Sequence, residues 1–399
     1  MLISRGVVAI VMIFTLVFPN YISMLLGISS TAPGLLASSL VISFVYVGIL
    51  SVDNKIALPS SYIKNYTLTM LLVLFIYILT ITINDYDFLH TRFLSSYLFL
   101  IGIMFVGAFL NDIILRCKTT DFNDIVSFIF WIFLFLGVIS TYLILNNIIP
   151  GKSMILFTEP SHYALFFSPF LLYKSYMEFN KRKKNLFIYL LLTFFIAILV
   201  ENVTLLVGLI ATLVVLYATK LRYFLPIVIA MIFFVINSEY FSTRMSLSTE
   251  VSNLSVLVYL SGWERAYLAL IDSYGLGLGF QQMGIGLEGI FMESLSKAGA
   301  GGLNYNDGGT LGSKIVAELG FLGIAFLIMY IKVGVHIFLS MIKNTGHLTS
   351  KVVFFNSIYL MMSLSIFIRA AGYFNSISLM FLLSLIWIDK EDKSYFKEL

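Results

Sequence analysis

The apolar residues of this chain are gathered into runs of about 16 to 25. A bilayer has a hydrocarbon core about 30 Å thick, and a helix needs roughly 20 residues to cross it. Because each segment in lipid must satisfy its own backbone hydrogen bonds, such runs are predicted to be helices. Only 12% of the residues are charged, against about 25% in soluble domains. The sequence therefore predicts an all-α, polytopic integral membrane protein with almost no soluble domain.

Twelve segments qualify as candidate spans. The first follows Arg5 and is predicted to be a retained anchor, because it lacks a small-residue cleavage site. Glu201 and Asn202 interrupt the seventh and eighth, and a tight hairpin there, with Glu201 at the outer surface, keeps the flanking basic clusters on one side of the membrane. The spans are predicted at 7–26, 33–52, 67–83, 93–115, 125–145, 162–178, 186–200, 203–219, 222–236, 311–335, 352–368 and 373–389.

Lysine and arginine residues in the connections predict the orientation. With the N-terminus inside, eighteen of them face the cytoplasm and seven face outwards, so both termini are expected to be cytoplasmic. The chain is expected to divide into a membrane domain of nine spans at 1–236, a long outer loop at 237–310, and C-terminal spans with a short tail at 311–399.

The outer loop carries a helix signal of its own. Ser261 and Glu264 have the spacing of a capping box, and the apolar residues that follow recur at helical spacing. A short amphipathic helix is therefore predicted to lie on the outer membrane surface. Arg265 then falls in its first turn, where free N–H groups and a guanidinium suit a phosphate group. The alternative is that Arg265 pairs with a local carboxylate or a lipid headgroup.

A glycine-rich run, Gly275–Phe280, follows that helix. It is superficially similar to a nucleotide-binding loop, but no strand precedes it and it faces the wrong side of the membrane for nucleotides. Its glycines are interpreted as backbone that approaches a ligand or another helix closely.

A polar segment at 157–162 precedes the sixth span. Pro160 suits the first turn of a helix, which puts Glu159 at the start of that helix. Glu159 is interpreted either as a simple cap or as a general base, with His162 three positions on. His162 taken alone is more typical of a hydrogen-bonded structural residue.

Further charged residues lie where the outer loop meets the membrane. Asp307, Thr310 and Lys314 open the tenth span, and Asp307 and Thr310 are also suited to capping it. Arg369 lies near the outer end of the eleventh span, and an ionisable residue at membrane depth is by default a functional hypothesis. The competing interpretation pairs Arg369 with Glu318 or with a carbonyl at a helix end.

Several kinds of chemistry lack the residues they need. The four histidines form no metal-ligand spacing, and the chain has no phosphate-binding loop, nucleophile elbow or metalloprotease helix. Cys117, the only cysteine, excludes an internal disulfide framework. The intramembrane charges form no proton relay. No metal or cofactor is expected, and the energy for any reaction is expected to come with an activated substrate.

Three segments resemble the Wzy-type polymerases of the O-antigen polymerase and ligase superfamily. Residues 157–164, Phe-Thr-Glu-Pro-Ser-His-Tyr-Ala, are similar to their Glu-Pro-Ser motif. The Trp-Glu-Arg helix and the glycine-rich run after it are similar to their long periplasmic loop, in which an arginine precedes a glycine-rich turn. Residues 312–323 are similar to the helix that follows that loop, and the number of spans, the length and the topology also agree.

Two positions depart from the superfamily. A Ser-Arg pair often precedes the span that begins near Val203, where this chain has Glu201 and Asn202. Ligase-like members often have a His-Asn pair before the post-loop helix, where this chain has Asn306 and Asp307. The second difference favours a polymerase over a ligase.

The resemblance implies a lipid-linked glycan polymerase of the bacterial inner membrane. The growing chain, held on undecaprenyl pyrophosphate, is expected to move onto the sugar of a new lipid-linked repeat unit at the periplasmic face, without metal or nucleotide. The expected partners are these lipid-linked oligosaccharide repeat units, membrane lipids and a chain-length regulator protein, but no nucleic acid.

The resemblance also assigns expected roles to residues. Glu159 is expected to be the general base, with His162 supporting or replacing it. Arg265 and Arg369, with Arg244 as a third, are expected to bind the pyrophosphate. The expected substrate-binding residues are in full Arg265, Arg369, Arg244, Asp307 and Lys314.

Two other functions remain open from the residues alone. The first is the related ligase, which transfers the finished polymer to lipid A core and differs only in the acceptor. The second is a flippase or transporter for lipid-linked glycans. A flippase is expected to have a cationic cavity lined by several helices and no dominant outer loop, whereas the charged candidates here gather on one face.

Overall fold

The computed structural model describes most of the chain. Two sequence predictions, the span at 222–236 (apart from Ile229) and a role for Arg244, lie outside the described residues. The described residues are 3–28, 30–52, 60–84, 86–149, 153–180, 185–218, 229, 253–285, 287–344, 346–369 and 372–395.

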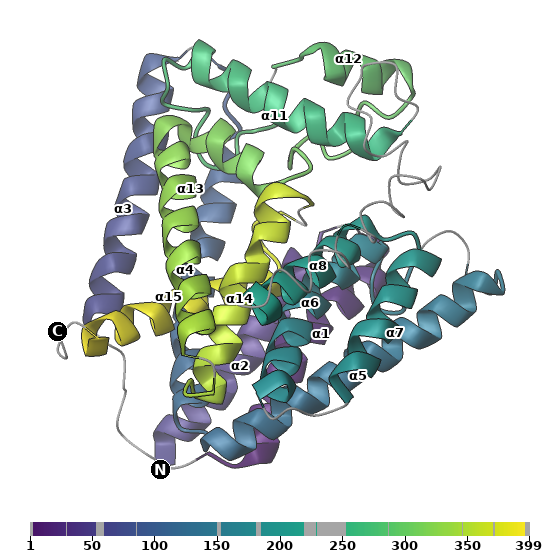
Figure 1. Ribbon diagram of the computed structural model, residues 1–399. Coiled ribbons are helices and arrows are strands. Elements are labelled where there is room, and N and C mark those ends of the chain that lie inside the picture. The colour runs from purple at the N-terminus through teal and green to yellow at the C-terminus, as the bar shows by residue number, and fades with distance from the viewer. Residues whose placement is uncertain are drawn as a thin grey trace.

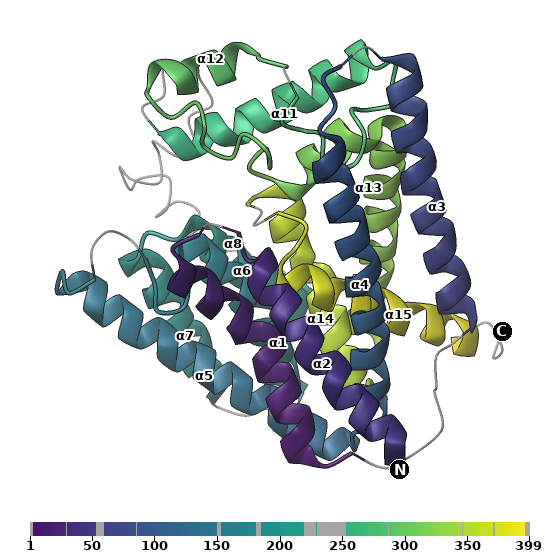
Figure 2. The ribbon, with the colours of Figure 1, turned by 180° about the vertical axis from the view of Figure 1, so that it is seen from behind.

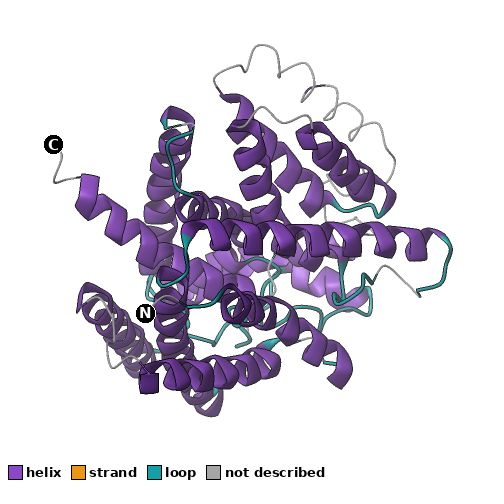
Figure 3. Cartoon of the chain, turned by 90° about the horizontal axis from the view of Figure 1, so that it is seen from below, coloured by secondary structure: helices purple, strands orange, loops and turns teal. Residues whose placement is uncertain are grey.

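Within these residues the chain forms thirteen named helices, and no named strand (Figure 3). The predicted all-α class is therefore confirmed for the described part of the chain. The helices are α1 (Arg5–Leu26), α2 (Ala32–Val52), α3 (Ser60–Ile83), α4 (His90–Leu115), α5 (Thr119–Leu145), α6 (Pro160–Asn180), α7 (Asn185–Leu199), α8 (Val203–Tyr217), α11 (Leu254–Asp272), α12 (Ile290–Lys297), α13 (Leu311–Lys343), α14 (Ser350–Phe367) and α15 (Ser376–Tyr395).

Eight of the described helices are long and apolar enough to cross a membrane: α1 to α5, α11, α13 and α14. Three shorter apolar helices, α7, α8 and the first part of α15, accompany them. A helix rises about 1.5 Å per residue, so roughly 20 residues match a bilayer core. Eleven of the twelve predicted spans coincide with a helix. The chain is thus a multi-pass membrane protein.

The helix α14 lies at the centre of the bundle. Nearly all of its side chains are buried, and it packs against α6, α13 and α15. Tyr330 of α13 and Tyr359 of α14 each donate a hydroxyl hydrogen bond to the other's backbone carbonyl, at 2.8 and 3.1 Å. Such pairing matters in lipid, where an unpaired polar group is costly. These contacts hold α14 in place, and with it the start of the segment that follows its last residue.

The helices α7 and α8 form the predicted hairpin. Glu201 adopts a positive φ of 55° between them, a conformation that is uncommon for a residue with a Cβ. Asn202 caps α8, because its side chain accepts a hydrogen bond from the Leu205 backbone N–H at 3.1 Å. The same side chain donates to the Pro160 carbonyl at 2.6 Å. The hairpin is thereby tied to the start of α6.

The helix α11 runs across the ends of α3, α4 and α13 instead of beside them (Figures 1 and 2). It begins at Leu254, after the N-cap Asn253, whose side chain accepts a hydrogen bond from the Ser255 N–H. The prediction that Ser261 starts this helix is therefore wrong, because Ser261 lies in its middle. Glu264 caps a different helix, since its carboxylate accepts hydrogen bonds from the first N–H groups of α12 at 2.8 and 2.9 Å.

The helix α13 is broken at Gly320, where φ is 59° and ψ is −133°. The break leaves backbone groups without helical partners. A glycine corner (Gly275, Gly277 and Gly279), with φ values of 85°, 81° and 90°, lies against the break. A Cβ on Gly277 would lie 2.6 Å from the Glu318 carbonyl oxygen, so only glycine allows this approach.

Backbone groups of the glycine corner form hydrogen bonds with the groups that the break at Gly320 leaves without helical partners. The N–H groups of Leu278 and Gly279 donate to the carbonyls of Ala317 and Glu318, each at 2.9 Å. In return, the Phe321 N–H donates to the Gly275 carbonyl at 2.8 Å. The sequence-based interpretation of these glycines, backbone that closely approaches a helix, is confirmed.

The cap of α12 provides a test of how the segment from α11 to α12 is held together. Replacing Glu264 with alanine removes the acceptor of two backbone N–H groups. We expect this change to cost about 1–2 kcal/mol of local stability, as loss of a good N-cap does. Limited proteolysis should then cut near residues 287–297 several times faster than in the wild type. Glu293→Ala, which removes an exposed carboxylate of α12 itself, is the control and should leave the cleavage rate unchanged.

Candidate functional site

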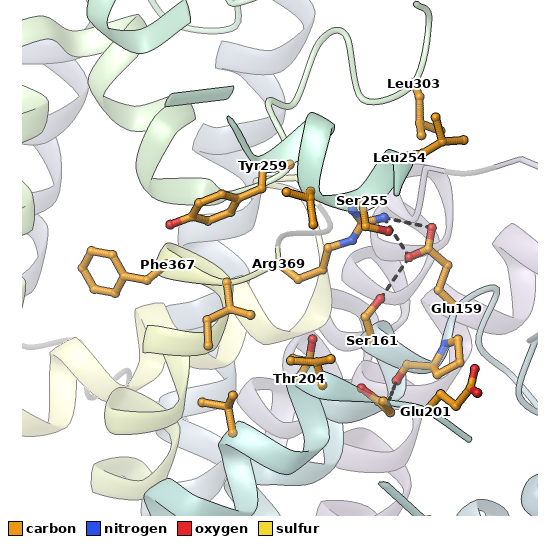
Figure 4. Close-up of a pocket in the computed structure, with 17 residues that line it drawn as sticks. Glu159, Ser161, Glu201, Thr204, Leu254, Ser255, Tyr259, Leu303, Phe367 and Arg369 are labelled. Atoms are coloured by element: carbon orange, nitrogen blue, oxygen red, sulfur yellow. Dashed lines mark hydrogen bonds and ion pairs between the residues drawn. The ribbon is translucent and has the colours of Figure 1, made fainter. Parts of the chain in front are cut away.

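A cavity of about 610 Å³ lies where four helix ends and the 300–310 loop meet. The start of α6, the α7–α8 turn, the start of α11 and the end of α14 form its walls (Figure 4). Its lining includes the charged side chains of Glu159, Glu201 and Arg369. By contrast, another cavity, of about 420 Å³ between α2 and α4, is lined by apolar residues, serines and a glycine.

Glu159 and Arg369 form an ion pair in the cavity. The Arg369 Nη2 lies 2.8 Å from one carboxylate oxygen of Glu159 and 3.1 Å from the other (Figure 4). The Ser161 hydroxyl donates to the nearer oxygen at 2.9 Å. Arg369 is thus paired with Glu159, and among the described residues its side chain forms no ion pair or hydrogen bond with Glu318 or with a carbonyl at a helix end. Two residues that sequence analysis had singled out separately are brought together across 210 positions of the chain.

The electrostatics keep Glu159 ionised. It precedes α6, and burial by itself raises the pKa of its carboxyl. The positive charge of Arg369, the nearby His162 and the hydrogen bonds from Ser161 and Arg369 outweigh burial and lower that pKa below its usual value. A carboxylate held in this way accepts protons weakly for as long as Arg369 stays beside it.

The charged end of the cavity faces an apolar end. Figure 4 shows Tyr259 and Phe367 on the far side of Arg369 from Glu159 and Glu201. Valine and isoleucine side chains also line the cavity, and Leu254 and Leu303 lie on the Glu159 side of Arg369 (Figure 4). A cavity with one charged and one apolar end suits an amphiphilic molecule.

Sequence reasoning missed Glu201 and Asn202 as site residues and treated them only as a helix break. Both line the cavity, and so do Thr204, Ser255 and Tyr259. The available signal was a polar pair between two apolar runs, because in a membrane protein such a pair marks a surface where helices end. Hydroxyl and amide groups of this kind are the usual partners of small polar ligands.

His162 is the third residue of α6 and is not among the residues that line the cavity. Its Nδ1 lies 3.3 Å from the Thr158 hydroxyl. This geometry fits the structural reading of His162 better than a direct role at the carboxylate.

A second cluster of charges lies beneath α11 and centres on Lys314. This side chain is only 1% exposed. Its Nζ lies 2.5 Å from an Asp307 carboxylate oxygen, 3.1 Å from the Asn306 carbonyl and 3.3 Å from the Gln281 amide oxygen. Glu318, which is fully buried, lies 4.0 Å away. Lys314 and Asp307 are therefore brought together, as part of a buried network.

The network holds the loop that lines the cavity. Ser313 donates its hydroxyl to the Gly308 carbonyl at 3.1 Å, and Gly309 is part of the cavity wall. Arg92, at the start of α4, donates to the Asn306 side chain at 2.6 Å and to the Gln281 side chain at 3.2 Å. Lys314 therefore positions the loop from its buried side, while the Asp307 side chain is 42% exposed.

Arg265 has a different position from the one predicted. It lies in the middle of α11, is 2% exposed, and donates to the carbonyls of Tyr305, at 2.6 Å, and of Met283. Its guanidinium also stacks on the Tyr305 ring at 4.7 Å. The expectation of a phosphate site in a first helical turn is corrected, because the helix begins eleven residues earlier. Arg265 joins α11 to the loop beneath it.

The site has the groups for acid–base and anion chemistry. Glu159 is a carboxylate that can accept a proton, and Arg369 is a fixed cation that can bind an oxyanion. Among the described residues no group of three or more histidine, cysteine, aspartate or glutamate side chains is placed to hold a metal ion.

Comparison with known proteins finds no protein-family model, no curated protein and no solved structure that matches this chain.

Proposed function

We propose that this protein is a glycosyltransferase that joins lipid-linked oligosaccharide repeat units, an O-antigen-type polymerase. The observation that carries the proposal is the Glu159–Arg369 pair inside an amphiphilic cavity at one end of an apolar helix bundle. Transfer from a polyprenyl-pyrophosphate donor needs a base for the acceptor hydroxyl and a cation for the departing diphosphate. The two side chains supply one of each.

The cavity offers the two kinds of surface that such a donor requires, one charged and one apolar. Its charged end suits a diphosphate and a sugar, and its apolar end suits the first part of a lipid chain. The diphosphate–sugar bond already supplies an activated leaving group, so neither a nucleotide nor a metal enters the proposed reaction. In this proposal Glu159 is the base, Arg369 binds the diphosphate, and Asp307 lies open beside the cavity loop for a sugar.

The proposal includes a location and partners. The cavity and α11 face the periplasm, both termini are cytoplasmic, and the protein resides in a bacterial inner membrane. The substrates are undecaprenyl-pyrophosphate-linked repeat units, and a chain-length regulator is a further partner. Arg265 and Lys314 support the site from beneath instead of contacting the diphosphate.

The test is reconstitution of the purified protein with a single lipid-linked repeat unit in the presence of EDTA and without nucleotide. We expect a ladder of two, three and more repeats on a gel. Arg369→Gln should lower the yield by about 10²–10³-fold, the usual loss when one donor to a developing oxyanion is removed. Arg5→Gln, which removes an exposed arginine paired with Asp124, is the matched control and should keep the ladder.

The same assay separates the rival functions. No ladder with the repeat unit alone, but transfer once lipid A core is added, would identify a ligase. Movement of the intact lipid-linked unit across vesicles without any new glycosidic bond would identify a flippase. Either result would replace the polymerase proposal.

A further inference from the structure

In this structure the proposed base, Glu159, is paired with Arg369, the residue proposed to bind the diphosphate. Both carboxylate oxygens of Glu159 lie within 3.1 Å of the Arg369 guanidinium, and Ser161 donates to one of them. A carboxylate with all of these partners has little remaining capacity to take a proton from a hydroxyl group. An arginine with this partner likewise has part of its donor fork already filled.

We propose that the Glu159–Arg369 pair is a latch that the donor diphosphate opens. The diphosphate takes the guanidinium from Glu159, and the released carboxylate becomes the base for the acceptor hydroxyl. This inference rests on the proposed function and adds an order of events to it. The donor must bind first, because its headgroup is what frees the base.

The geometry allows the exchange. The Glu159 side chain is 43% exposed, whereas Arg369 is 16% exposed and follows the buried helix α14. The arginine is therefore the fixed partner and the carboxylate the one with room to move. A diphosphate carries more negative charge than a carboxylate and offers more oxygens to the planar fork, so it competes well for the same cation.

The other charged and titratable groups around Glu159 do not replace the arginine. His162 faces it from α6, Glu201 belongs to the α7–α8 turn, and Tyr259 comes from α11. The pKa of Glu159 is lowered mainly by Arg369, and it therefore rises when the diphosphate neutralises that charge. The carboxylate becomes a stronger base at the moment it is needed.

The transfer step that follows is balanced. The oxygen of the acceptor hydroxyl forms a bond to the anomeric carbon of the donor sugar, and its proton passes to Glu159. The bond between that carbon and the diphosphate oxygen breaks, and its electron pair stays on the diphosphate. The added negative charge is stabilised by Arg369. The products are the extended glycan and the lipid diphosphate, and Glu159 returns its proton to water.

The test is a comparison of diphosphate affinity between wild type and variants of the full-length protein in detergent. Farnesyl diphosphate is titrated calorimetrically at low ionic strength, with inorganic pyrophosphate in a parallel series. Because Glu159 competes with the ligand, Glu159→Gln should bind about tenfold more tightly, a gain of about 1.4 kcal/mol. The variant should at the same time lose transfer. Arg369→Gln should lose the binding.

Glu293→Gln is the control, because it removes one exposed carboxylate on α12 and changes the net charge by the same amount as Glu159→Gln. Its affinity should equal that of the wild type. If Glu159→Gln does not fold, Ser161→Ala removes the hydroxyl that holds Glu159 in place and should tighten binding about two- to threefold. Unchanged or weaker binding in the variant that folds would overturn the latch while leaving the polymerase standing. No binding to the wild type would overturn both.

Discussion

Replacing Glu159 with glutamine is expected to lower the rate of chain extension by about 10²–10⁴-fold, the usual contribution of a positioned general base. Glutamine keeps the size of the side chain and one oxygen, so Ser161 and Arg369 still have an acceptor. The proton acceptor is lost, because an amide does not accept a proton at neutral pH. The measurement is the initial rate of dimer formation from one lipid-linked repeat unit by the reconstituted protein.

Two controls give this result its meaning. Glu293→Gln, on the exposed face of α12, should extend chains at the wild-type rate. His162→Gln separates the two residues assigned to the base by sequence. His162 pairs with Thr158 and does not line the cavity, so its replacement should change the rate severalfold at most. A Glu159→Gln variant that extends chains normally would remove Glu159 from the mechanism.

The sequence was sufficient to predict the helices, but not which side chains from different helices form pairs. Long apolar runs specify helices regardless of their neighbours, because lipid offers the backbone no other partner. The same reasoning identified Glu159 and Arg369, since polar residues at helix ends in a membrane are conspicuous. Their ion pair could not be read from the chain, because nothing local links the start of α6 to the end of α14. That link depends on how the helices pack.

The error at Arg265 has a specific cause. Ser261 and Glu264 have capping-box spacing, but Asn253 provides a cap earlier in the chain and the helix simply continues through Ser261. Glu264 was therefore free to cap α12, which a local pattern cannot reveal. The same limit hid the burial of Arg265, whose partners are the carbonyls of residues 283 and 305. By contrast, the interpretation of the glycine corner was correct, because positive φ and close approach are local properties of glycine.

Lys314→Met is expected to be the most destabilising single change in the segment from α11 to the start of α13. The Lys314 side chain is 1% exposed and forms an ion pair with Asp307. It also lies 4.0 Å from the fully buried Glu318. Methionine keeps most of the volume but leaves Glu318 without its nearest positive charge. Removing one partner of a buried pair typically costs about 3–5 kcal/mol, because the remaining charge has lost its compensation. Unfolding of the detergent-solubilised protein, followed by circular dichroism, measures the loss.

The control for this change is Lys297→Met, since Lys297 forms an ion pair with Glu293 at 2.7 Å on the exposed face of α12. Exposed pairs contribute little, so its unfolding midpoint should match the wild type. The double variant Lys314→Met/Glu318→Gln should recover a large part of the stability, because the buried charge is removed together with its partner. If Lys314→Met unfolds like the wild type, the network does not hold the cavity loop. Lys314 would then have to be reconsidered as a residue that meets the substrate directly.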